Sequence, residues 1–134
     1  MNDKPNDDQL QLPRGAFIAF RQSGGLRFST REVIVYNDGR VIYQQQGKLG
    51  AGEGSRRITP DEVAELKEMI EQSNLIGLPR SIGRQSLDGY AYELIARAGG
   101  QIKSFEFFDG STPPELQTLL AHFKSLMTVD DTQV

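Results

Sequence analysis

The chain holds few side chains of the types that carry enzymatic chemistry. Its one histidine, His122, lies in a segment with helical apolar spacing, and position 126, four residues later, is Leu rather than a second metal ligand. There is no cysteine, which excludes disulfides, thiolate catalysis and cysteine-ligated metals. No Gly-x-Ser-x-Gly motif marks a serine nucleophile. We therefore interpret His122 as a surface or half-buried helix residue, and we expect no catalytic residue, metal ion or cofactor.

Three carboxylates share one sequence context. Asp38, Asp88 and Asp109 each stand directly before a glycine. Aspartate in this place accepts hydrogen bonds from nearby backbone N–H groups, and the following glycine tolerates positive φ, so Asp-Gly is typical of turns and strand ends. A pair of acids for glycoside hydrolysis is the alternative. Turn chemistry accounts for all three residues, so we favour it.

A glycine-rich segment spans residues 47–57, with glycines at 47, 50, 52 and 54. It lacks the Gly-x-x-x-x-Gly-Lys-Ser/Thr spacing of a phosphate-binding loop, because Lys48 stands at its start. We expect a flexible loop or an irregular link into a helix. A segment of this kind is also suited to docking into a partner's groove.

Two neighbouring segments are rich in aromatic residues: Tyr90, Tyr92, Phe105, Phe107 and Phe108. Such residues can stack on the bases of single-stranded nucleic acid, but those platforms come with a positive groove. Here Glu93 and Glu106 interleave, and the net charge of the chain is −3. The pattern therefore favours packing in a core, and we expect no nucleic-acid partner.

The overall composition is that of one ordinary domain. The chain has 134 residues, 37% of them apolar and 25% charged, which argues against wholesale disorder. Residues 1–14 and 128–134 are polar, so we expect flexible tails around a domain at 15–127. Neither a signal peptide nor an apolar run of membrane-spanning length is present, so we expect a soluble cytoplasmic protein.

The spacing of apolar residues and the positions of turn residues predict the strands that must position any site. Strands are predicted at 15–21, 31–36, 40–46, 89–97 and 101–108, with an Asn-Asp-Gly turn at 37–39. In the last two strands Tyr90, Tyr92, Leu94 and Ala96 share one face, and Ile102, Phe105, Phe107 and Phe108 are expected to be buried.

Two helices are predicted from capping signals and apolar spacing. The first begins at Thr59-Pro60-Asp61-Glu62, where Thr59 and Glu62 form a capping box, and it stops at Gly77 and Pro79. The second begins at Thr112-Pro113-Pro114-Glu115. The result is an α+β, two-layer domain with an antiparallel sheet of four to five strands and two helices on one face, in the order β-ββ-α-ββ-α. The other face of the sheet is left open to water or to a partner.

Several short motifs follow one another along the chain: Ser23-Gly24-Gly25-Leu26, the helix start Ile58 to Leu66, Leu75-Ile76-Gly77-Leu78-Pro79, Asp88-Gly89-Tyr90-Ala91-Tyr92-Glu93-Leu94, Gly99-Gly100, Asp109-Gly110 and Pro113-Pro114-Glu115-Leu116. Their order resembles that of the emfourin family of small bacterial inhibitors. The motifs cover roughly residues 16–127. The chain departs from the pattern in its glycine-rich loop and in Phe28.

The resemblance implies a non-catalytic inhibitor of protealysin-like and thermolysin-like metallopeptidases. A flexible segment would enter the peptidase cleft and fill a pocket with an apolar side chain, while the scaffold lowers the ordering cost. Leu49 is one candidate, and Leu10 and Leu12 in the tail are others. Phe28 and the basic pair Arg56 and Arg57 complete the expected partner-binding residues.

Two other functions stay open. The chain can be an interaction module that inhibits nothing and binds another protein through the open sheet face or a loop. An enzyme is the least favoured class, because histidine, cysteine and clustered acids are lacking. In each binding hypothesis the partner is a protein, no membrane is involved, and the chain is expected to be a monomer.

Overall fold

A computed structural model describes residues 10–24, 29–47, 52–73, 81–82, 89–98, 100–108 and 114–127, and every structural statement below concerns these residues. The elements in chain order are β1 (Ala16–Gly24), β2 (Ser29–Tyr36), β3 (Arg40–Gly47), β4 (Gly52–Arg57), α1 (Pro60–Gln72), β5 (Ser81–Ile82), β6 (Tyr90–Ala98), β7 (Gln101–Phe108), the 3-10 helix η2 (Pro114–Leu116) and α2 (Gln117–Met127).

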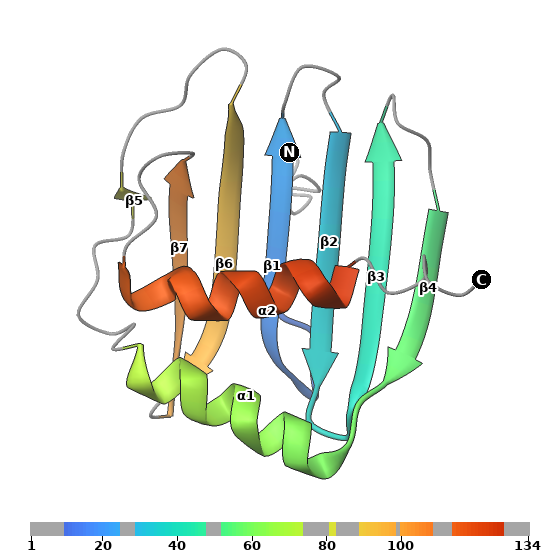
Figure 1. Cartoon of the computed structure of the whole chain (residues 1–134), viewed down its shortest axis with the longest axis vertical. Helices are drawn as coiled ribbons and strands as arrows, with labels where there is room; N and C mark the ends of the chain where they lie inside the picture. Colours follow the sequence, from blue (N-terminus) through green and yellow to red (C-terminus); the bar gives the residue numbers. More distant parts are fainter. Residues whose placement is uncertain are drawn as a thin grey trace, which may run out of the picture.

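The strands form one sheet in the order β4-β3-β2-β1-β6-β7-β5 (Figure 1). Every neighbouring pair from β4 to β7 is antiparallel, and only the two-residue β5 pairs parallel, with β7. The predicted α+β class with an antiparallel sheet is confirmed. The predicted number of four to five strands is too low, because the glycine-rich segment supplies β4 and β5 adds a short edge.

β4 escaped prediction because glycine is unfavourable in strands. Its sequence is Gly-Glu-Gly-Ser-Arg-Arg, and each of its residues pairs in register with β3, from Gly52 opposite Gln45 to Arg57 opposite Arg40. The glycine at position 54 has a packing cause: a Cβ there would lie 2.6 Å from the hydroxyl oxygen of Tyr43. Gly54 therefore makes room for a tyrosine, as glycine does where another group approaches a strand closely.

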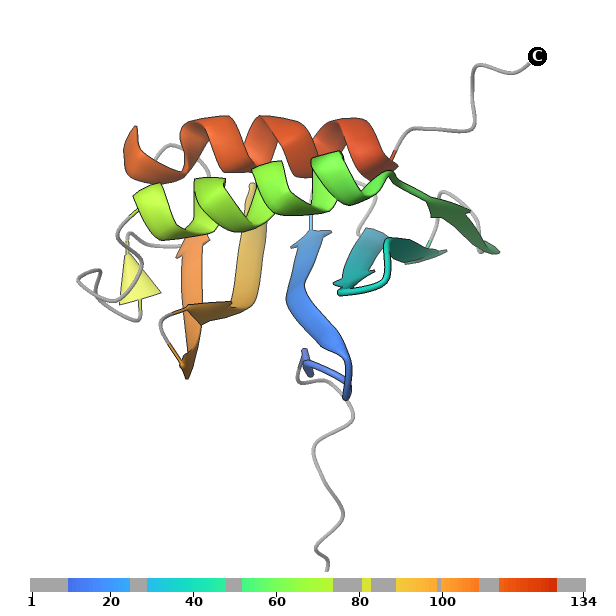
Figure 2. The same cartoon turned by 90° about the horizontal axis from the view of Figure 1, so that it is seen from below.

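Both helices lie on the same face of the sheet (Figure 2), which gives two layers with the core between them. Alternate residues of the central strands point into this core, because successive side chains of a strand face opposite sides. Phe20 of β1 is fully buried there and stacks on Phe123 of α2, with ring centroids 5.1 Å apart. Tyr92 and Phe107 stack beside them at 5.3 Å. The predicted inward face of residues 90–96 is thus observed in the core.

The first helix begins as predicted. The backbone N–H of Glu62 donates to Thr59 Oγ1 at 3.1 Å, and the backbone N–H of Thr59 donates to Glu62 Oε1 at 2.9 Å. This reciprocal pair is a capping box, and Pro60 occupies the first turn. α1 ends at Gln72 with Ser73 as its cap. The predicted stop signals at 77 and 79 lie outside the described residues, as do Thr112 and Pro113 before α2.

The expected burial of residues in β7 is partly wrong. Phe105 and Phe107 lie in the core under the helices, but Ile102 is 54% exposed. The reason is the strand period: Ile102 differs from Phe105 and Phe107 by an odd number of residues, so it points to the opposite face. Phe108 is buried, yet it shares that opposite face with Ile102, so it does not belong to the core under the helices.

Residues 10–15, before β1, lie on the side of the sheet away from the helices (Figure 2). Residues 10–14 fall within the predicted tail, but Leu10 is buried and Leu12 is half-buried. Leu10 is absent from the core cluster under the helices, as are the buried Ala16 and Ala19 of β1. The described part of this segment is therefore packed, and Leu10 is not an exposed side chain offered to a partner.

We expect Phe123→Ala to lower the free energy of unfolding by about 3–5 kcal/mol, because it removes a fully buried ring and leaves a cavity. The exposed Thr118 of the same helix provides the matched control, and Thr118→Ala should change stability by less than about 0.5 kcal/mol. Urea denaturation followed by circular dichroism measures both values. Equal effects would contradict the packing of α2 on β1.

Candidate binding surfaces

The open face of the sheet carries a regular pattern of charged and apolar side chains. Antiparallel register places side chains of neighbouring strands directly opposite one another, so each register line is a row across the face. One line, here called the acidic row, consists of Glu53, Gln44, Glu32, Arg21, Glu93 and Glu106. The next line, the apolar row, consists of Ser55, Ile42, Ile34, Ala19, Ile95 and Ser104.

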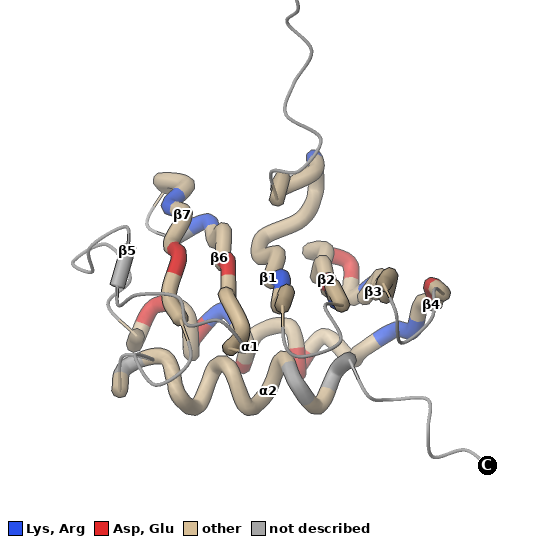
Figure 3. The backbone as a smooth tube through the Cα atoms, turned by 90° about the horizontal axis from the view of Figure 1, so that it is seen from above, with Lys and Arg blue, Asp and Glu red and all other residues tan. Residues whose placement is uncertain are grey.

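Arg21 stands at the centre of the acidic row. Its Nε and Nη2 atoms each lie 2.7 Å from Glu93 Oε1, and its Nη1 atom lies 3.3 Å from Glu32 Oε2. The side chain of Arg21 is only 13% exposed. One guanidinium thus bridges carboxylates of the two strands that flank β1, which ties β2, β1 and β6 together on the face that no helix covers (Figure 3).

The acidic row carries a net negative charge, because its glutamates outnumber its one arginine. Figure 3 shows acidic positions on β7, β6, β2 and β4, and a basic position on β1 between them. Glu53 and Glu106 lie at the two ends of the row and are exposed. Arg21 forms ion pairs with the two central glutamates, Glu32 and Glu93. The outer parts of the row therefore favour cations or basic side chains of a partner.

The apolar row provides the hydrophobic part of the open face. Ala19 at its centre is fully buried, whereas Ile34, Ile42 and Ile95 are half-buried. A row of β-branched side chains that stays partly accessible can bury more apolar area when another surface covers it. The open face therefore combines an apolar stripe with an adjacent charged stripe.

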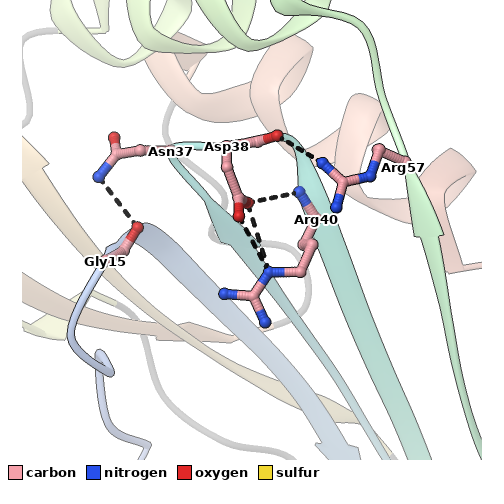
Figure 4. A network of polar contacts seen from close by, with 5 residues as sticks. All are labelled: Gly15, Asn37, Asp38, Arg40 and Arg57. Atoms are coloured by element: carbon pink, nitrogen blue, oxygen red, sulfur yellow. Dashed lines mark hydrogen bonds and ion pairs between the residues drawn. The ribbon is translucent and has the colours of Figure 1, made fainter.

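The β2–β3 turn at one end of the sheet is held by many polar contacts (Figure 4). The backbone and side-chain N–H groups of Asn37 both donate to the carbonyl of Gly15 at 2.9 Å. Arg57 Nη1 donates to the carbonyl of Asp38 at 3.0 Å, and the guanidinium of Arg40 lies 4.2 Å from the ring centre of Tyr36. These bonds fix the start of β1, the turn and the end of β4 relative to one another.

Asp38 carries the one resolved pKa shift among the described residues. The backbone N–H of Arg40 donates to its carboxylate at 3.0 Å, which lowers the pKa of Asp38 below its ordinary value of 3.8. The guanidinium of Arg40, 3.2 Å away, and the charge of Arg57 act in the same direction. The predicted role of Asp38 in a turn is therefore observed, and Arg40 and Arg57 nearby compensate the charge of its carboxylate.

Phe28 and Leu49 belong to the chain connections between β1 and β2 and between β3 and β4. Both residues lie outside the described part of the chain, but their flanking strands are described. Ser29 pairs with Gly24 on one side and with Gly47 on the other, so the β1–β2 and β3–β4 connections leave the sheet from adjacent strands. The connection into β6 ends at this end of the sheet too, because Gly24 pairs with Tyr90, the first residue of β6. We call this the turn-bearing end.

An open hollow of about 590 Å³ lies at the turn-bearing end beside β3 and β4. Its described lining consists of Gln44, Gln45, Gln46, Gly47, Gly52 and Glu53. Glutamine amides and glycine backbone groups can donate and accept hydrogen bonds along an extended chain. The hollow therefore offers hydrogen-bonding groups to a peptide backbone.

Of the four expected partner-binding residues, Arg56 and Arg57 lie in the described part of the chain, and Phe28 and Leu49 lie outside it. Arg56 and Arg57 end β4 beside the clamped β2–β3 turn. Arg57 donates to Asp38 there, so it has a structural role. The sequence analysis missed Arg21, Glu32 and Glu93; the signal was a charged residue inside each of three strands, but only the register shows that they meet.

The described residues contain no group of three or more His, Cys, Asp or Glu side chains arranged to hold a metal ion. Tyr92, Phe105 and Phe107 are buried under the helices, where they are inaccessible to nucleic-acid bases. Within the same described ranges, no helix has the length and apolar character needed to cross a membrane.

No protein-family model matches the chain, and no curated protein sequence matches it either.

We expect Arg40→Ala to raise the pKa of the Asp38 carboxyl without restoring its ordinary value, because the backbone N–H of residue 40 stays in place. A pKa depressed by folding means that ionised Asp38 stabilises the fold above its unfolded pKa, and this contribution is lost as pH falls through the folded pKa. An NMR titration of the side-chain carboxyl carbon measures the shift. Arg97→Ala, on the distant strand β6, should leave it unchanged.

We expect Arg21→Ala to lower the free energy of unfolding by about 1–3 kcal/mol, because two partly buried carboxylates lose their shared cation. Arg97, exposed on the same face of β6, is the matched control for losing an arginine side chain. Chemical denaturation of Arg97→Ala should give a change below about 0.5 kcal/mol. If both variants lose the same stability, the bridge does not hold the three strands together.

Proposed function

We propose that this chain is a small non-catalytic protein-binding domain that inhibits a thermolysin-like metallopeptidase. The motif order that resembles the emfourin family motivates the target class. The structural observation that carries the proposal is the antiparallel pairing of β3 and β4, the two strands that flank residues 48–51 in the sequence. We call this pair the frame. Register contacts run from Arg40 opposite Arg57 to Gln45 opposite Gly52, so both ends of the short segment 48–51 are attached to one sheet.

A frame of this kind suits inhibition for a physical reason. A segment whose ends are already fixed loses less conformational freedom on entering a cleft than a free peptide does. If the peptidase cuts the segment, the β3–β4 ladder keeps both new ends in place, which favours religation over release. We therefore assign Leu49 as the side chain that enters the peptidase pocket, with Phe28 on the adjacent connection as a second contact.

The hollow beside β3 and β4 supports the turn-bearing end as the surface that contacts the peptidase. Its glutamines and glycines lie next to the frame and can hydrogen-bond the backbone of a cleft wall. Basic Arg56 and Arg57 lie at the other end of β4, so we place them outside the peptidase contact. The expected cytoplasmic location stays a prediction, as does the absence of a nucleic-acid partner.

The test is a titration of a purified thermolysin-like peptidase with the full chain. We expect activity to fall linearly to near zero at a fixed stoichiometry, with the chain left intact. Leu49→Ala should raise the inhibition constant about 100-fold or more, as loss of a central apolar anchor does. Ile102→Ala is the control, because Ile102 is an exposed apolar residue at the far end of the sheet.

Two results would overturn the proposal. One is cleavage between residues 47 and 52 with full recovery of activity, which makes the chain a substrate. The other is equal inhibition by Leu49→Ala and the unmodified chain, which removes Leu49 from the contact.

A second candidate function is an interaction module that uses the open sheet face and inhibits no peptidase. The adjacent acidic and apolar rows favour it, because they offer a partly accessible stripe of Ile34, Ile42 and Ile95. Ile42→Lys, tested in the same peptidase titration, separates the two surfaces. Unchanged inhibition by this variant keeps the turn-bearing end as the contact, and lost inhibition with an intact circular dichroism spectrum moves the contact to the open face.

A further inference from the structure

β4 forms one edge of the sheet, and no described residue pairs with its outer side (Figure 1). An unpaired edge presents a row of N–H and C=O groups that can bond to another strand. Natural edges are usually blocked by proline, by a bulge or by charged side chains. β4 has no proline, and its pairing with β3 is continuous over all six of its residues. Its three charged side chains, Glu53, Arg56 and Arg57, are of both signs.

The direction of the backbone groups of β4 follows from one hydrogen bond to the β2–β3 turn. The N–H of Ile58 donates to the carbonyl of Gly39 at 2.9 Å, so the backbone groups of residue 58 point toward β3. Successive residues of a strand alternate in this respect. Residues 54 and 56 therefore bond to β3, and the N–H and C=O groups of Glu53, Ser55 and Arg57 point to the free edge.

The same three residues also share the open face, because they lie in register with Gln44, Ile42 and Arg40 of β3. Along this edge the side chains are negative, neutral and positive, at equal spacing. Read in the opposite direction, the order becomes positive, neutral and negative. An antiparallel second strand of the same sequence therefore meets the first with opposite charges at both ends.

We propose that β4 pairs with β4 of a second copy of this chain, antiparallel and centred on Ser55. Ser55 then faces Ser55 of the second copy, and Glu53 faces Arg57 of the second copy on both sides of the axis. Every outward N–H and C=O group of these residues finds a partner. On the other face, Arg56 of each copy lies opposite Gly54.

Other registers of the β4–β4 pair are less favourable, either in the charges that they place opposite each other or in their backbone hydrogen bonds. A shift that centres the pair on Arg56 places two arginines directly opposite each other, which is unfavourable. A shift that centres it on Gly54 leaves Arg57 without an opposite member in β4. Registers that pair an odd-numbered residue with an even-numbered one set outward backbone groups against inward ones, so the ladder cannot form.

The pairing closes on itself. A twofold axis at Ser55 uses the β4 edge of both copies, so the product is a dimer with one continuous sheet and not an open fibre. Both copies keep their helices on the same side. Because the two β4 strands run in opposite directions, the turn-bearing ends point away from each other and stay accessible.

Cysteine chemistry provides a direct test, because the chain has no cysteine of its own. Opposed residues of an antiparallel pair have Cα atoms about 5.5 Å apart, which is within the range of a disulfide. Under mild oxidation we expect Ser55→Cys to form a covalent dimer. Glu65→Cys, exposed on α1, is the control and should stay mostly monomeric. Equal cross-linking of both variants, or none of Ser55→Cys, overturns the proposal.

A charge exchange tests the register. We expect Glu53→Arg and Arg57→Glu each to weaken self-association by about 10-fold, measured by sedimentation equilibrium, because each places like charges opposite each other at two points. An equal mixture of the two variants should associate again, since every opposite pair in the mixed dimer has opposite charges. Arg57→Glu also loses the bond to Asp38, so a thermal melt must first show that it is folded.

Failure of the mixture to associate, with both variants folded, overturns the assigned register. Ser55→Pro gives a further check, because it removes an outward N–H group and no bond to β3. We expect it to abolish the dimer and leave peptidase inhibition unchanged. A chain that is monomeric at millimolar concentration overturns the proposal without affecting the proposed inhibition.

Discussion

The central strand β1 is the element on which the rest of the structure depends, because it is buried on both faces. Ile18 and Phe20 lie fully buried under the helices, and Ala19 is fully buried on the other face. β1 also pairs along its length with β2 and with β6, which are far apart in sequence. Its position brings the two hairpins into one sheet and gives α2 a surface for Phe123.

The two faces of this sheet differ in the side chains that they carry. Under the helices the side chains are almost all apolar, and aromatic rings such as Phe20 and Tyr92 stack on one another in the core. On the open face a charge stands at the centre of β1, and Arg21 keeps it compensated by bonding to a glutamate on each neighbouring strand. A partly buried charge without such partners would be costly. The bridge therefore lets the open face stay polar along one row while the next row stays apolar.

Local signals in the sequence predicted much of this fold, and long-range pairing accounts for what they missed. The capping box at Thr59 and Glu62 is a contact between residues three apart, and the inward face of Tyr92 and Leu94 follows from strand period. The strand at residues 52–57 could not be predicted, because the cause of its central glycine, Gly54, is Tyr43 on another strand. The acidic row could not be predicted either, since alternation places each glutamate on a face but only register brings Glu32 and Glu93 to Arg21. Leu10 is a further case, because a short polar-flanked segment gives no sign that its leucine will be covered.

The contrast between the two ends of the sheet explains how one small domain can hold a rigid frame and still offer a contact surface. At one end, Asn37, Asp38 and Arg57 connect β1, the β2–β3 turn and β4 through direct hydrogen bonds. At the other end, the strands diverge into connections that follow Gly24 and Gly47, both at positive φ. Because the clamped end fixes the directions of the strands, the places where the connections leave the sheet are fixed as well. Residues in those connections can then change in sequence at little cost to the core, which is the arrangement expected of a scaffold that presents a binding segment.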